Sequence, residues 1–174
     1  MADQVKTGKH PKGLYVLFLT EMWERFGYYL MVGILLLFLT NSTGKGLPKA
    51  MGADVVGTFI ALVYLTPFIG GLIADRYLGY IKSIFIGGTL MAAGYLTIAL
   101  PGEYTAYIAM ALIIIGNGFF KPNISTLLGN MYNREDLRPL KDNAYNIFYM
   151  GINIGAFFCN FVAAILRNRI SWQA

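Results

Sequence analysis

Residues 14–40 read LYVLFLTEMWERFGYYLMVGILLLFLT, an apolar run that carries three charged side chains, Glu21, Glu24 and Arg25. A helix needs about 20 residues to cross the hydrocarbon core of a bilayer, and this run is longer. A charge at the bilayer centre costs about 2.5–3.5 kcal/mol on insertion scales, so we expect these side chains to have partners and a function. The stretch therefore predicts a membrane-spanning helix whose charged side faces protein and not lipid.

Four more apolar runs of similar length follow, at 55–74, 82–100, 104–128 and 144–166, and 56% of the chain is hydrophobic. A soluble core helix would show a polar face, which these runs mostly lack. The sequence predicts an all-α, multi-pass membrane protein with five transmembrane helices in a lipid bilayer. Pro48 predicts the start of a short helical approach to the second span, and 75–80 predicts a tight turn after it.

Residues 1–13 are polar and predict a retained tail, because the apolar run after them is too long for a signal peptide and has no small-residue cleavage site. The tail and the loops on the amino-terminal side of the membrane contain eight lysine and arginine residues, and the loops on the other side contain four. This bias predicts a cytoplasmic amino terminus, and the short loops favour a bacterial cell (inner) membrane. The chain stops soon after its fifth span, so we expect 14–174 to be an incomplete amino-terminal bundle of a longer protein.

Several function classes find no support in the composition. The net charge of +5 follows the loop asymmetry and forms no basic patch interleaved with aromatics, so we expect no nucleic-acid partner. Cys159 is the only cysteine and His10 the only histidine, which excludes an internal disulfide, a zinc site and a histidine-based triad. We expect no enzyme activity, no metal and no cofactor.

The charges of the first span fall on one side of a helix. At 100° per residue, Arg25 and Tyr28 each lie within about 40° of Glu21, with Glu24 and Tyr29 beside them. Glu21 precedes Arg25 in the favourable i,i+4 order. Two alternatives stay open: a structural ion pair that only fixes helix packing, and a span that begins after the charged segment and leaves the charges at the interface.

Lys121 brings a fourth charge into the membrane, within the stretch GNGFFKPN at 116–123. Pro122 leaves the carbonyl of Gly118 without its helical donor, and such irregular helix is tolerated where it is buried or lines a wet cavity. The alternatives are a plain packing kink at the proline and a lysine that extends to the interface. With both glutamates ionised, the four charges sum to zero.

Polar and small residues accompany these charges. Tyr28 and Tyr29 share the charged helix and are candidates for a cavity wall. Asn153 is one of three asparagines spaced by seven in the fifth span, and these could donate to a ligand or join helices. Gly151 and Gly155 form a small-xxx-small pair, which favours helix packing.

Four stretches resemble one family, the proton-dependent oligopeptide transporters. EMWERF at 21–26 is similar to the ExxERF motif of their first helix, and GGLIADRYLG at 70–79 resembles their form of the major facilitator loop motif. Lys121 with the Pro and Asn that follow it matches the helix-four lysine, and FYMGINIGAF at 148–157 resembles the helix-five motif. The resemblance covers nearly the whole chain, from span one to span five.

The resemblance implies a major facilitator-type helical bundle with twelve core helices in two six-helix halves. This chain would supply five transmembrane helices of the amino-terminal half, and the missing carboxy-terminal half would be its partner. The implied function is proton-coupled symport of di- and tripeptides by alternating access, with protons as the coupling ion.

The resemblance also implies roles for single residues. Proton coupling would involve Glu21, Glu24, Arg25 and Lys121; substrate binding would involve Arg25, Tyr28, Tyr29, Tyr64, Lys121 and Asn153; gating would involve Asp75 and Arg76. Without the motif, Asp75 and Arg76 would mark an ordinary positive-inside turn. One departure is Val32, where family members usually carry a second arginine, and it bears on how a peptide carboxylate is held.

Two other functions compete with this hypothesis. A major facilitator of another small solute, such as a sugar or an exported drug, would share the loop motif but would have no need of the charged cluster in spans one and four. A non-transporting membrane sensor would bind peptides without accumulating them across a pH gradient.

Overall fold

The structure is a computed structural model that describes residues 9–169, with side chains described to residue 166. Within this range it contains five long helices: α1 (Lys12–Thr40), α2 (Lys49–Ile73), α3 (Tyr80–Ile98), α4 (Thr105–Met131) and α5 (Lys141–Arg169). All five are long and apolar enough to cross a membrane. The predicted all-α, multi-pass architecture is confirmed. Of the predicted tail, residues 1–8 lie outside the described part of the chain, as do residues 170–174 of the bundle.

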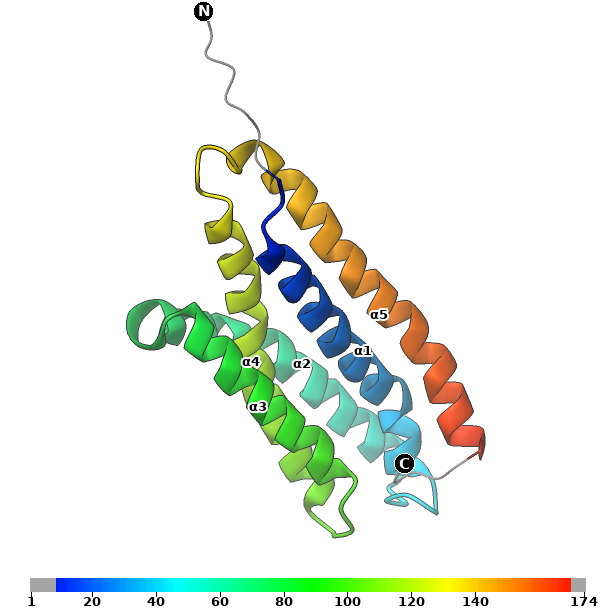
Figure 1. Ribbon diagram of the computed structural model, residues 1–174. Coiled ribbons are helices and arrows are strands. Elements are labelled where there is room, and N and C mark those ends of the chain that lie inside the picture. Colours follow the sequence, from blue (N-terminus) through cyan, green and yellow to red (C-terminus); the bar gives the residue numbers. More distant parts are fainter. Residues whose placement is uncertain (1–8, 170–174) are drawn as a thin grey trace, which may run out of the picture.

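The helices pack in two groups (Figure 1). α1 lies along α5, whereas α4 packs against both α3 and α2. The predicted small-residue pair joins the first group, because Gly151 lies against the Phe18 ring and Gly155 against the backbone carbonyl of Met22. Gly155 thus packs as expected. The two groups meet where α1 faces α2 and α4, and the charged residues of α1 lie on the side of this junction that reaches α4.

The amino-terminal segment and the α4–α5 connection lie at the same end of the bundle (Figure 1). A hydrogen bond of 2.7 Å between His10 Nδ1 and the Tyr132 hydroxyl joins them there. Tyr132 follows α4 directly and is fully buried. The contact between His10 and Tyr132 agrees with the Lys/Arg bias of the sequence, which predicts that the amino-terminal segment and the α4–α5 connection lie on the same side of the membrane.

The predicted turn at 75–80 contains the point where the chain reverses, but most of this stretch is helical. α2 continues into a π-helical turn, η1 (Ala74–Leu78), and the chain reverses only at Gly79, whose φ of 76° suits glycine. No helix-breaking residue precedes Gly79 in this stretch, so the helix runs on. Pro48 occupies the N-cap position of α2. The short helix that the sequence predicted between Pro48 and the second span is therefore the first part of α2.

α4 is the most buried helix of the bundle. Its buried side chains include Ile113, Phe120, Ile124 and Leu128, which belong to the main apolar cluster. The remaining helices expose large apolar side chains along much of their length, as expected for surfaces that meet lipid. α4 therefore positions its polar residues more firmly than any other helix.

Candidate functional site: a buried charged cluster between two helix groups

The three charges of α1 form one cluster. Arg25 Nε lies 3.3 Å from Glu21 Oε1 and also pairs with the Glu24 carboxylate. Glu21 and Arg25 are each 3% exposed. They lie near the middle of the 29-residue α1. This position argues against the alternative in which the span begins after the charges.

The cluster is incompletely satisfied. Oε2 of Glu21 and Nη2 of Arg25 are buried and have no hydrogen-bond partner among the described residues. One guanidinium shared by two ionised carboxylates leaves a net charge of −1, and low dielectric makes such a charge expensive. Binding one proton removes that charge. The carboxyl pair can therefore be balanced either by the nearby Lys121 cation or by one bound proton.

Lys121 lies on α4, half-buried, at a distance from these pairs. Its Nζ is 4.9 Å from the centre of the Tyr64 ring on α2, within range of a cation–π interaction. Among the described residues it forms no ion pair with Glu21 or Glu24, although both carboxylates interact with it electrostatically. Ten residues of α4 separate it from the helix end at Met131, which argues against a lysine that extends to the interface.

α4 contacts the cluster through a residue that the sequence motifs did not single out. Asn117 is fully buried, and its Nδ2 donates to Glu24 Oε1 at 3.4 Å. Asn117 precedes Lys121 by one helical turn, so the two share a face of α4. That spacing is the signal that could have found it.

Tyr28 and Tyr29 follow the cluster along α1. The Tyr28 ring lies 5.2 Å from the Arg25 guanidinium, stacks on Phe59 of α2 and is only 4% exposed. Tyr29 is 36% exposed and Tyr64 is 64% exposed. Tyr28 therefore supports the cluster from within the bundle, whereas Tyr29 and Tyr64 present open surface.

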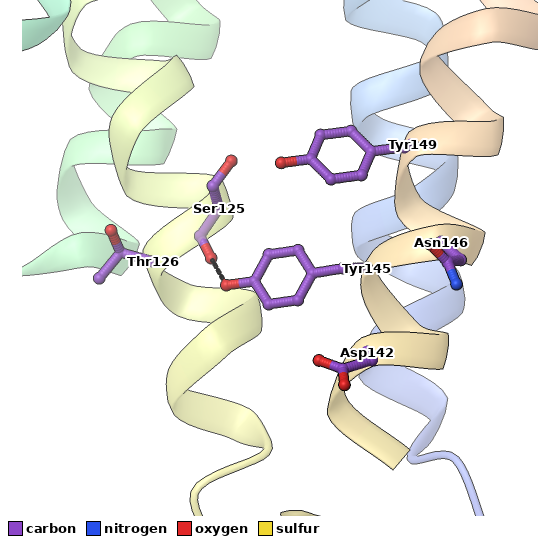
Figure 2. Close-up of a pocket in the computed structure, with 6 residues that line it drawn as sticks. All are labelled: Ser125, Thr126, Asp142, Tyr145, Asn146 and Tyr149. Carbon is purple, nitrogen blue, oxygen red and sulfur yellow. Dashed lines mark hydrogen bonds between the residues drawn. The ribbon is translucent and has the colours of Figure 1, made fainter.

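Asn153 lies on the exposed side of α5, one turn beyond Tyr149. A pocket of about 590 Å³ opens between α4 and α5 (Figure 2), lined by Ser125, Thr126, Asp142, Tyr145, Asn146 and Tyr149. Tyr145 and Tyr149 project from α5 towards α4, and the Tyr145 hydroxyl donates to the Ser125 carbonyl at 3.2 Å. The pocket does not include Asn153, and no described contact joins Asn153 to the charged cluster.

Pro122 acts in packing. α4 continues through the proline, and the carbonyl of Gly118, which Pro122 leaves without its helical donor, faces Gly70 of α2. A side chain at residue 70 would meet this carbonyl. The absent hydrogen bond therefore coincides with the closest approach of α2 and α4.

Asp75 and Arg76 are both exposed on the π-helical turn after α2. The Arg76 guanidinium lies 5.8 Å from the centre of the Tyr77 ring, and no ion pair joins Arg76 to Asp75 in the described range. In residues 9–166, no group of three His, Cys, Asp or Glu side chains could hold a metal ion.

The chain was compared with known proteins. The family model described as "PTR2: POT family" matches residues 81–174. "Uncharacterized transporter YclF" of Bacillus subtilis is 41% identical over 168 residues, which is 94% of this chain and 34% of that protein. A "Di-/tripeptide transporter" of Lactococcus lactis is 40% identical over 169 residues, 94% of this chain and 34% of that protein. The chain thus spans about a third of the length of these relatives.

The fold agrees with solved structures of the same kind. A crystal structure of the peptide transporter POT in complex with sulfate matches with a TM-score of 0.90 and 39% identity, over 97% of this chain and 35% of that one. The helical arrangement is therefore that of a major facilitator-type transporter. Sequence family and fold lead to the same conclusion: the chain belongs to the POT family.

Proposed function

We propose that this chain is the amino-terminal part of a proton-coupled symporter of di- and tripeptides. A carboxy-terminal half would complete the molecule and the central binding site, and alternating access of the two halves would carry the peptide. We place the protein in the cell (inner) membrane with a cytoplasmic amino terminus. Family membership and the printed names of peptide-transporting relatives support the substrate class.

One observation carries the proposal: two glutamates share one arginine inside the bundle, with a lysine on the facing helix that pairs with neither of them. Arg25 is occupied by Glu21 and Glu24, whereas Lys121 Nζ lies over the Tyr64 ring and forms no ion pair with either carboxylate in the described part of the chain. The arrangement separates a proton-binding group from a cation that can receive an anion. Both functions are needed to couple a peptide to a proton.

The coupling follows from charge balance. With both glutamates ionised, Glu21, Glu24, Arg25 and Lys121 sum to zero. A peptide carboxylate bound at Lys121 adds one negative charge to a poorly solvated site, and protonation of one glutamate restores neutrality. Proton and peptide therefore favour each other's binding by a reciprocal free energy of typically about 1–3 kcal/mol.

Lys121 and exposed residues of three other helices are the proposed substrate surface. Tyr64 and Tyr29 offer aromatic faces and hydroxyls to the peptide, and Asn153 offers an amide from α5. Arg25 binds the peptide when protonation of a glutamate releases the guanidinium from its ion pair. Asp75 and Arg76, exposed at one end of α2, are proposed to form a gating contact with the rest of the transporter.

Two rival functions predict different results. A transporter of another solute would not be inhibited by di- and tripeptides. A peptide-binding sensor would bind peptides without moving them uphill. The buried glutamate pair favours symport over the sensor, which requires no proton-binding group at this depth, and the cation at Lys121 favours a substrate with a carboxylate over a sugar.

The test is uptake of a labelled dipeptide into proteoliposomes that contain the full-length protein, with and without an imposed pH gradient. We expect accumulation above equilibrium only with the gradient, inhibition by unlabelled di- and tripeptides, and no inhibition by sugars. Binding without accumulation would favour the sensor. Absence of dipeptide uptake, with gradient-driven uptake of a labelled sugar by the same protein, would favour the other transporter class.

A further inference from the structure

We propose that Asn117 is a positioning residue for Glu24: its amide holds the proton-free carboxylate across the α1–α4 junction and so sets the pH at which the transporter takes up its proton. The inference rests on the proposed function and assigns a regulatory contact within the same site. It starts from the hydrogen bond of Asn117 Nδ2 to Glu24 Oε1, at 3.4 Å.

The backbone fixes Asn117 from both sides. A side chain at Gly116 would meet the Gly87 carbonyl of α3 at 2.7 Å, and one at Gly118 would meet Thr66 of α2 at 2.9 Å. Three successive residues of α4 thus face α3, α1 and α2 in turn, as expected for steps of 100°. Asn117 cannot move towards α1 or away from it without breaking two close helix contacts.

The charged and titratable groups that interact with Glu24 come from α1, α3 and α4, among them Tyr28 of α1, with one indirect contribution from α2. Glu21 and Arg25 lie on α1 itself, and Lys121 lies on α4. Tyr95 of α3 has a buried hydroxyl without a described partner, close to Gly27 and within the electrostatic influence of Glu24. From α2, Tyr64 acts through its contact with Lys121. Asn117 donates to Glu24 without carrying a charge.

The amide can serve both protonation states of Glu24. Its NH₂ group donates to the ionised carboxylate, whereas its carbonyl oxygen, which is buried without a described partner, can accept from a protonated carboxyl group after rotation of the amide. Hydrogen bonds to an ionised group are about twice as strong as neutral ones, so Asn117 favours the ionised form overall. Its removal should let Glu24 take up a proton at higher pH.

The experiment uses the full-length protein in proteoliposomes and measures dipeptide counterflow as a function of pH. Asn117→Leu and Asn117→Ala both remove the amide. We expect each variant to move the midpoint of the pH profile up by about one pH unit. This is the lower end of the range for a hydrogen bond to a charged group, and we choose it because the 3.4 Å distance is long. The matched control is Asn123→Leu on the same helix, since Asn123 is equally buried but donates only to the Phe119 carbonyl of its own helix.

An unchanged midpoint in both Asn117 variants, with a pH-dependent wild type, would overturn this inference alone. An equal shift in Asn123→Leu would do the same, because it would assign the effect to helix packing. So would failure of both Asn117 variants to fold while Asn123→Leu folds, since Asn117 would then serve stability. A wild type with no pH-dependent uptake would overturn the proposed function, and the inference with it.

Discussion

At the scale of single residues, Arg25 shows how one side chain can hold two carboxylates of the same helix. Because Glu21 lies one turn before Arg25 and Glu24 lies beside it, both carboxylates reach one guanidinium. Removing a single partner from such a buried group costs about 3–5 kcal/mol, because an uncompensated charge remains. Protonation of one glutamate is therefore expected to destabilise the cluster far less than substitution of one of its charged residues.

Val32 offers a test at this scale. It lies two turns after Arg25, half-buried against the apolar core, where the transporter family usually has an arginine. We predict that Val32→Arg raises peptide affinity about tenfold, the value of one hydrogen bond to a charged group. The added cation should also lower the pH at which the glutamates take up a proton. The check is dipeptide binding measured across a pH series.

Val32→Leu is the matched control for this prediction, since it changes shape but adds no charge, and its affinity and pH dependence should stay close to those of the wild type. If neither quantity moves in Val32→Arg, residue 32 does not face the substrate site.

The sequence predicted this site in part. The charges of α1 were found from their helical spacing alone, because intramembrane charges are costly and rare. The separation of Lys121 from both carboxylates was not predictable, since the tilt between α1 and α4 depends on close glycine contacts far apart in the sequence. Asn117 was missed although its one-turn spacing from Lys121 places it on the same face of α4; its contact with Glu24 itself needed the packed structure.

At the scale of helices, glycine decides where α2 and α4 cross. Gly70 lies directly against the Gly118 carbonyl, which Pro122 leaves without a helical donor. The sequence did not locate this crossing, because it left open whether Pro122 produces only a plain packing kink. The predicted end of the second span, at 74, agrees with the end of α2 at Ile73, whereas the π-helical form of the residues that follow, up to the reversal at Gly79, was not foreseen.

We predict that Gly70→Ala lowers the thermal stability of the full-length protein, by about 1–3 kcal/mol in free energy of unfolding. The added methyl group would meet backbone, which cannot move aside as a side chain can. Gly57→Ala on the same helix is the matched control, because nothing lies within 4 Å of the added carbon. This control should be neutral or stabilising by about 0.5–1 kcal/mol. Thermal unfolding of both variants in detergent checks the pair, and equal stability of the two would contradict the assigned crossing.

At the scale of the whole molecule, the two helix groups meet along α1, which packs against α2 near Gly52 and reaches α4 at the charged cluster. α1 pairs with α5, and α4 with α2 and α3, so the polar contacts of Glu24 and the aromatic contacts of Tyr28 span the junction. A change of charge at this junction acts on both groups at once. This is the physical basis on which we propose that protonation is linked to transport.

The most direct measurement compares wild type with Glu24→Gln, full length, in proteoliposomes. Gln keeps the size of the side chain but cannot bind or release the proton. We predict that Glu24→Gln loses peptide accumulation under an imposed pH gradient and retains counterflow of labelled peptide, which needs no net proton movement. Glu103→Gln, on an exposed connection outside the spans, should retain both activities. Accumulation of peptide above equilibrium by Glu24→Gln would contradict the account.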